Sequence, residues 1–216
     1  MITRISMVPR RIGLGSEEFQ KHWHDVHGPL VLRLKGLRRS RQNHALLRDG
    51  EPLLPWTGFD ACAELDFDDA AALQTAFGEH YPAELKADSN HLLDTSNAAP
   101  MVVQRVHVAG EIDLKRVRLM TFMRRAPDCT IAQLEAALRA IPVASVAHAR
   151  QLYLSVESAA ATAGRSGFDA IDVQWFDGPH DAEHYVTSTE AREHRHAIGR
   201  VVQGVERLIA QVRVIM

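Results

Sequence analysis

Three histidines and a tryptophan crowd the short stretch FQKHWHDVHGPL, which runs from Phe19 to Leu30. An imidazole has an unperturbed pKa of about 6.5, so it can give or take a proton near neutral pH. A neutral imidazole is also a common metal ligand. Which of these roles His22, His24 and His27 can fill depends on how the segment packs.

The segment predicts a helix with one apolar stripe. Residues at helical spacing form the stripe, namely Phe19, Trp23, Val26 and Leu30. This spacing favours core packing for Trp23, whose indole N–H then needs a partner or a ligand. His22 and His27 flank the stripe, whereas His24 points away from it toward solvent.

The dipeptide Gly28-Pro29 predicts that the helix kinks or ends directly after His27. Pro29 has no backbone N–H, and its ring clashes with the carbonyl four residues earlier, at Asp25. A break at this point lets His27 turn inward. His27 is therefore the preferred candidate for a general acid/base.

The same histidines are candidates for metal ligands. Only His24 and His27 have a spacing that shares a helix face, and no carboxylate completes a recognised ligand set with them. We therefore expect no metal. No glycine pattern of a phosphate-binding loop occurs, so we expect no cofactor either.

Composition limits the function classes. The chain has 216 residues, 46% of them hydrophobic, and a formal net charge of -2, which argues against nucleic acid or a membrane as the main partner. Two cysteines, Cys62 and Cys129, make no disulfide framework. With no signal-peptide pattern and no long apolar run, the expected location is the cytoplasm.

Sequence landmarks recur at a near-constant shift, which predicts two copies of one unit. RISMVPRR (from Arg4) lines up with RLMTFMRR (from Arg118), and GFDA at Gly58 returns at Gly167. The predicted units are residues 1–110, holding the active site, and residues 117–216, a degenerate copy.

Each unit reads as β-α-β-β-α-β, the order of a ferredoxin-like fold. The predicted strands are Ile2 to Val8, Ser40 to Leu47, Phe59 to Phe67, Met101 to Val108, Val117 to Arg125, Arg150 to Val156, Asp169 to Phe176 and Val205 to Ile215. The predicted class is α+β, with two antiparallel sheets face to face around a barrel-like interior that holds the ligand. The chain is then a monomer with an internal pseudo-dimer, or a homodimer.

Other candidate residues lie on the predicted strands. The third strand turns Asp60 and Glu64 to the interior, opposite Trp175 of the second unit. Asp60 recurs as Asp169, which favours a structural role, whereas Glu64 is matched by Val173 and is the better candidate to polarise His27.

Three further residues are candidates for the pocket. His44 aligns with Tyr153, and either both point into the cavity or both make ordinary hydrogen bonds at the sheet. Trp56 precedes the third strand and is a candidate lid. The predicted substrate-binding set is Trp23, His22, Trp56, Asp60, Tyr153 and Trp175, and the catalytic set is His27, Glu64 and His44.

The segment SEEFQKHWHDVHGPL resembles the signature of EthD-type proteins of the dimeric α/β-barrel superfamily. GFDACAELDF is similar to that family's third strand, and AELKADSNHLLD to the end of its second helix. The second unit matches only in outline, since IAQLEAALRAIP has neither His nor Trp. The resemblance implies a dimeric α/β-barrel, chemistry without a cofactor and a catalytic role for His27.

Three functions follow as hypotheses. The first is a cofactor-independent isomerase, lyase or cyclase acting on a small hydrophobic, ring-derived substrate in a catabolic or secondary-metabolic pathway. The second is a non-catalytic binding or accessory protein for an aromatic intermediate. The third is a cofactor-free monooxygenase.

Overall fold

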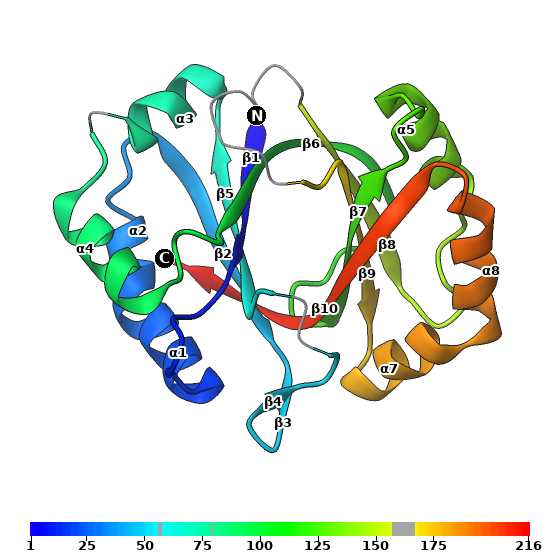
Figure 1. Cartoon of the computed structure of the whole chain (residues 1–216), viewed down its shortest axis with the longest axis horizontal. Helices are drawn as coiled ribbons and strands as arrows, with labels where there is room; N and C mark the ends of the chain where they lie inside the picture. The colour runs from blue at the N-terminus through cyan, green and yellow to red at the C-terminus, as the bar shows by residue number, and fades with distance from the viewer. Residues whose placement is uncertain (56–57, 79, 157–166) are drawn as a thin grey trace.

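A closed eight-stranded antiparallel barrel forms the centre of the molecule. The computed structural model describes residues 1–55, 58–78, 80–156 and 167–216. The barrel strands are β1 (Ile2–Val8), β2 (Leu37–Ala45), β5 (Ala61–Phe67), β6 (Ala99–Gly110), β7 (Val117–Arg125), β8 (Ala149–Ser155), β9 (Ala170–Phe176) and β10 (Val202–Ile215). A small hairpin, β3 (Leu47–Arg48) and β4 (Glu51–Pro52), projects from the barrel (Figure 1).

Helices cover the barrel on two opposite sides (Figure 1). On one side lie α1 (Ser16–His22), the π-helical turn η1 (Trp23–His27), α2 (Gly28–Val31), α3 (Ala70–Phe77) and α4 (Ala83–Leu92). On the other lie α5 (Ile131–Ala140), α7 (Pro179–Thr187) and α8 (Thr189–Ile198). None of the helices in the described ranges is long and apolar enough to cross a membrane.

Each half of the chain contributes four neighbouring strands. The order around the barrel is β1-β5-β2-β10-β7-β9-β8-β6, so one half supplies β6-β1-β5-β2 and the other β10-β7-β9-β8. The long strands β6 and β10 join the halves, because β6 pairs with β8 and β10 pairs with β2. All eight predicted strands are present, and the α+β class is confirmed.

The two halves also share a side-chain motif. Asp60 accepts hydrogen bonds from the backbone N–H and the Nε of Arg10, each at 2.9 Å. Asp169 accepts the same pair from Arg125, at 2.9 and 3.1 Å. Asp60 thus connects the end of β1 to the start of β5, which fits the structural role that its recurrence favoured, and it is not among the residues that line the cavity beside His27.

Apolar side chains pack in the barrel interior, where the ligand cavity was predicted. Three of these residues, Met7, Phe59 and Phe168, also line a depression at one end of the barrel. From Ala61 to Phe67 the predicted alternation holds, with Cys62 in the interior and Leu65 and Phe67 against the helices. Phe59, which precedes β5, joins the interior cluster instead. An eight-stranded barrel is just wide enough for its own side chains to fill, and here apolar residues from both halves fill it.

A buried ion pair crosses this core from one half to the other. Glu64 on β5 and Arg118 on β7 meet at 2.5 Å, and their side chains are 0% and 2% exposed. Asn43 donates to Glu64 at 2.9 Å and accepts from Arg118 at 2.7 Å. Burial raises the pKa of Glu64, but Arg118 and Arg41 together lower it by more than burial raises it. The pKa therefore lies below its ordinary value, and the carboxylate stays charged.

We predict that Arg118→Met destabilises the protein by about 3–5 kcal/mol, because Glu64 then remains buried without its nearest counter-ion. Denaturant unfolding followed by circular dichroism measures the change. The double variant Glu64→Gln/Arg118→Met is the control and should regain most of the loss. A single-variant loss below about 0.5 kcal/mol, the size of an ordinary surface substitution, would show that the pair is not the constraint described.

Candidate functional site

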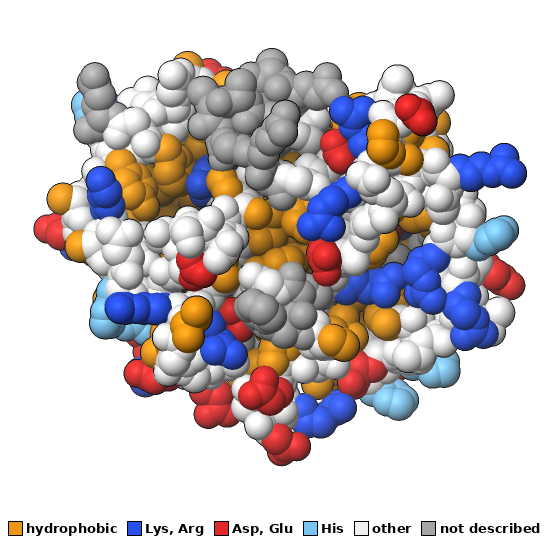
Figure 2. Space-filling model, in the orientation of Figure 1, with side chains coloured by type: hydrophobic (Ala, Val, Ile, Leu, Met, Phe, Trp, Pro, Cys, Tyr) orange, Lys and Arg blue, Asp and Glu red, His pale blue; other side chains and the backbone are white. Residues whose placement is uncertain are grey.

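A cavity of about 420 Å³ lies between the outer face of β1, β2 and β5 and the helices of the first half. In Figure 2 a hollow of hydrophobic side chains opens between α3 and α4, with a basic side chain at its edge. Its walls combine apolar residues with a few polar ones, as ligand sites do. The lining includes Arg4, Ser6, Trp23, His27, Val31, Leu34, Gln42, Leu65, Phe77, Tyr81, Leu85 and Ser89.

The corresponding layer of the second half holds a smaller space. Among its described residues, a cavity of about 50 Å³ lies between the sheet and α5, α7 and α8. Arg150 and Asp172 form a buried ion pair at 3.0 Å in this layer. A wider depression of about 690 Å³ opens at one end of the barrel, but it does not include His27. The enclosed space that meets the histidine helix therefore belongs to the first half.

The histidine helix continues through Gly28-Pro29 by changing its winding. The backbone N–H of Gly28 bonds to the carbonyl of Trp23, five residues earlier, which defines the π-helical turn η1. Pro29 then occupies the first turn of α2, where a missing N–H costs little. The prediction that the helix ends at this dipeptide is therefore wrong.

The wider turn decides which side chain faces inward. In a regular helix Val26 would follow Trp23 on the buried stripe, but Val26 is 43% exposed, and His27 is only 7% exposed. A turn closed by an i to i+5 bond takes more residues, so the buried position moves from Val26 to His27. The predicted stripe is correct for Phe19 and Trp23 and wrong for Val26.

Gly28 lets the helix sit close to the sheet. A Cβ atom at this position would come within 3.2 Å of Ile215 Cγ2 and 3.4 Å of Gln42 Nε2. Both neighbours belong to barrel strands, β10 and β2. The glycine thus allows the backbone beside His27 to approach the barrel wall.

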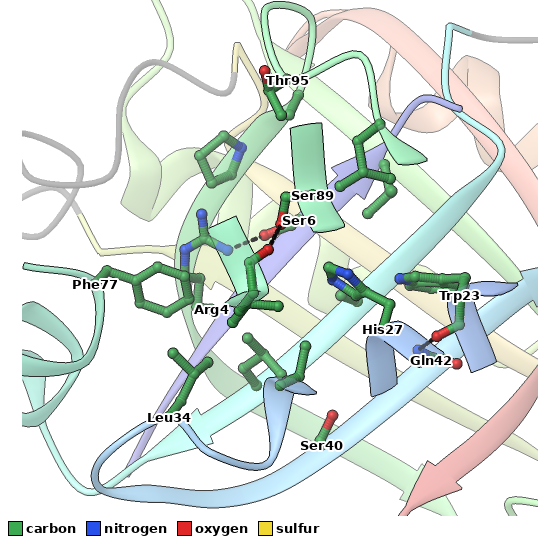
Figure 3. A pocket seen from close by; sticks show the side chains of 18 of the residues that line it. Arg4, Ser6, Trp23, His27, Leu34, Ser40, Gln42, Phe77, Ser89 and Thr95 are labelled. Atoms are coloured by element: carbon green, nitrogen blue, oxygen red, sulfur yellow. Dashed lines mark hydrogen bonds between the residues drawn. The ribbon is translucent and has the colours of Figure 1, made fainter. Parts of the chain in front are cut away.

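His27 is fixed by a carboxylate from α4. Its Nδ1 lies 2.7 Å from Asp88 Oδ2, and the other oxygen, Oδ1, lies 2.7 Å from His22 Nε2. A carboxylate accepts, so the neutral imidazole carries its proton on Nδ1. In the described part of the chain no group bonds to His27 Nε2, and His27 lines the cavity beside Trp23 (Figure 3). Nε2 is thus the atom open to a ligand.

Burial favours the neutral form of His27. Burial lowers the pKa of His27 below its ordinary value, Asp88 raises it in part, and His22 lowers it again. Burial raises the pKa of Asp88, but its bonds to His22 and His27 bring it below its usual range. At neutral pH a neutral imidazole therefore faces the cavity beside an ionised carboxylate, as a general base requires.

Trp23 is held by a chain of polar contacts behind the cavity. Gln42 donates to the Trp23 carbonyl at 2.7 Å, and His44 Nε2 lies 2.9 Å from Gln42 Oε1. The ring of His44 packs 4.8 Å from that of Trp23, and burial lowers the pKa of His44 to about 3. His44 was predicted to assist His27 in catalysis. It does not line the cavity, and its contacts support Trp23 instead.

Three of the predicted residues lie on the other face of the sheet. Glu64, Tyr153 and Trp175 point into the barrel interior, so Glu64 cannot polarise His27. His22 contacts Asp88 and does not line the cavity. Trp56, the predicted lid, lies outside the described residues.

Asp88 and Arg4 are site residues that the sequence did not single out. Asp88 stands between Leu85 and Leu92, the buried positions of α4, and a carboxylate beside such a stripe was the available signal. Arg4 alternates with interior residues on β1, so its direction followed from strand periodicity. No group of three or more His, Cys, Asp and Glu side chains arranged to hold a metal occurs among residues 1–55, 58–78, 80–156 and 167–216.

Comparison with known proteins adds a family to this geometry. Residues 11–96 match the family model of the EthD domain. This EthD segment contains both His27 and Asp88. It ends before β6, and Arg4 precedes it. No curated protein sequence matches the chain.

Solved structures share the barrel at low sequence identity. A protein named anthrone oxidase-like aligns with 99% of this chain and 92% of its own, at TM-score 0.70 and 14% identity. Two proteins named "putative monooxygenase" align with 99% of this chain. The protein from Fusobacterium nucleatum has a TM-score of 0.56 and 9% identity, with 93% of its own chain covered. The protein from Lactobacillus acidophilus has a TM-score of 0.54 and 8% identity, with 94% of its own chain covered. These likenesses concern the fold alone, and the closed antiparallel barrel is consistent with a dimeric α/β-barrel-like fold.

We predict that the imidazole of His27 titrates below the ordinary value of about 6.5, and lower still in Asp88→Asn, because the carboxylate raises its pKa. NMR of the ring protons against pH measures both midpoints. Asp25→Asn is the matched control, since Asp25 contacts His24 at the surface and should leave His27 unchanged. An upward shift in Asp88→Asn would contradict the assigned contact.

Proposed function

We propose that the protein is a cofactor-independent enzyme that moves a proton on a small, hydrophobic, ring-derived substrate, with His27 as the general acid/base. Isomerisation, elimination and cyclisation all begin with such a step. The observation that carries the proposal is the open Nε2 of His27, held at the cavity wall by the contact between Nδ1 and Asp88.

The contact with Asp88 serves the proton transfer in two ways. It sets the tautomer, so the lone pair of Nε2 faces the ligand, and it stabilises the imidazolium that forms when Nε2 takes a proton. His27 then returns the proton to another atom of the substrate, which completes an isomerisation, or to a leaving group, which completes an elimination. Trp23 supplies a flat apolar wall beside the imidazole.

A second candidate is oxygenation of the same type of substrate. The neighbours named as an anthrone oxidase-like protein and as monooxygenases favour it, although they share the fold at low identity. Removal of a proton by His27 would be its first step too, with oxygen consumed afterwards. A third candidate, a carrier for an aromatic intermediate, needs the cavity but no turnover.

We further propose that residues 1–110 and 117–216 are two copies of one unit, of which the second is structural. The repeated strand order, the paired Asp60–Arg10 and Asp169–Arg125 contacts, and the smaller cavity of the second half support this. On this proposal the chain closes its barrel alone, and a homodimer would add contacts without completing the site.

We predict that the protein catalyses exchange of acidic C–H protons for deuterium in a panel of cyclic ketones and lactones. His27→Ala and the larger His27→Gln should both lower the exchange rate about 10²- to 10⁴-fold, the usual contribution of a general base. Proton NMR in D₂O follows the exchange and does not require the natural reaction to be known.

His24→Ala is the matched control, because His24 lies on the same helix but bonds to Asp25 at the surface, and its rate should equal that of the native protein. Oxygen uptake is recorded in parallel and would select the second candidate. Tight binding of panel members without exchange by the native protein would overturn catalysis and leave the carrier function.

A further inference from the structure

The cavity contains a cation as well as a base. Arg4 on β1 lines it, and its guanidinium carbon lies 4.1 Å from the centre of the Phe77 ring. Figure 3 shows Phe77 and Leu34 on one side of the cavity and Trp23 and His27 on the other. The guanidinium that packs against Phe77 therefore stands apart from the imidazole, across the space that a ligand would occupy.

Few described groups of the protein bond to this guanidinium. A guanidinium has five N–H donors, and Arg4 gives one hydrogen bond, from Nη1 to Ser6 Oγ. Among the described residues no carboxylate lies within ion-pair distance of Arg4, and no Asp or Glu lines the cavity. Arg4 is half-buried. A charge withdrawn from water is normally paired, so a guanidinium without a carboxylate partner in a cavity wall points to an anionic ligand.

The electrostatic surroundings agree with this reading. Burial lowers the pKa of Arg4 to about 10, so the group stays protonated at neutral pH but at a cost. An anion brought into contact with it would recover that cost. Tyr81, which also lines the cavity, and the ring of Phe77, through a cation–π contact, compensate for this cost only in part.

We infer that Arg4 is the anion-binding residue of the cavity and that the natural ligand is an apolar ring compound bearing a planar oxyanion, either a carboxylate or an enolate or phenolate oxygen. The inference rests on the proposed function for the place of the reacting carbon near His27. The ring would lie among the apolar residues between the two groups. If the oxygen belongs to the carbonyl next to that carbon, Arg4 stabilises the enolate formed when His27 takes the proton.

The test compares 2-naphthoate with 2-naphthamide, which have the same ring system and differ in the charge of one group. Isothermal titration calorimetry at pH 7 measures the affinity of each for the native protein. The carboxylate should bind at least tenfold more tightly. Arg4→Met should remove this preference, and Arg4→Lys should keep part of it, because a lysine retains the charge but not the planar pair of donors.

Arg38→Met is the matched control, since Arg38 pairs with Asp68 at the surface and its loss should leave the preference intact. Glu79→Gln is measured as well, because Glu79 lies outside the described residues. A tenfold gain in naphthoate affinity in that variant would mean that an acid of the chain already occupies Arg4. Three results would overturn the inference. They are that gain in affinity, the absence of a preference for the carboxylate in the native protein, and a preference for the carboxylate that survives in Arg4→Met.

The two proposals fail separately. His27→Gln should retain the preference for the carboxylate while it loses deuterium exchange. If the native protein prefers the carboxylate but exchanges no proton, Arg4 binds an anion in a protein that is not the proposed enzyme. If exchange occurs and the preference is absent, the enzyme stands and the role of Arg4 is wrong.

Discussion

The i to i+5 bond between Gly28 and Trp23 is the constraint on which the site depends. It shifts the buried stripe of the helix by one residue, so an imidazole enters the helix–sheet layer where a valine would otherwise pack. A buried imidazole then needs a partner, and α4 provides the carboxylate of Asp88. From that contact follow the tautomer and the open Nε2, and burial favours the neutral state. Every chemical property assigned to His27 thus depends on the local π-helical winding of its helix.

The location of the cavity follows from how the two faces of the sheet are filled. Both halves contribute large side chains to the barrel interior, where Glu64 and Arg118 neutralise each other. The helix–sheet layer is filled separately in each half, and an ion pair lies in the second one. In the parts of these layers that the structure describes, the first keeps about 420 Å³ and the second about 50 Å³. The two halves thus share a strand arrangement but differ in how their helix–sheet layers are filled.

Sequence periodicity was sufficient for the strands and insufficient for the site. Alternation of apolar residues placed Cys62 and Glu64 on the interior face of β5 and Leu65 on the helix face, because a strand has a fixed period. Alternation along a strand could not predict which face of the sheet holds the cavity, because both faces are enclosed. The change of winding at Trp23 broke the helical period, so Val26 was predicted inside and His27 beside it. Asp88 and His27 meet through packing of two helices, which no local pattern encodes.

The floor of the site is completed by a segment far from it along the chain. Ile215 on β10 lies against Gly28, and its strand pairs with β2, with Ile215 opposite Ser40. During synthesis the histidine helix leaves the ribosome long before this strand exists. Until then β2 has an unpaired edge, and only Gln42 of β2 lies beneath Gly28 among these neighbours. The layer around His27 is therefore completed only by the end of the chain, and shortening the chain at its carboxyl end would first remove Ile215 from beside Gly28.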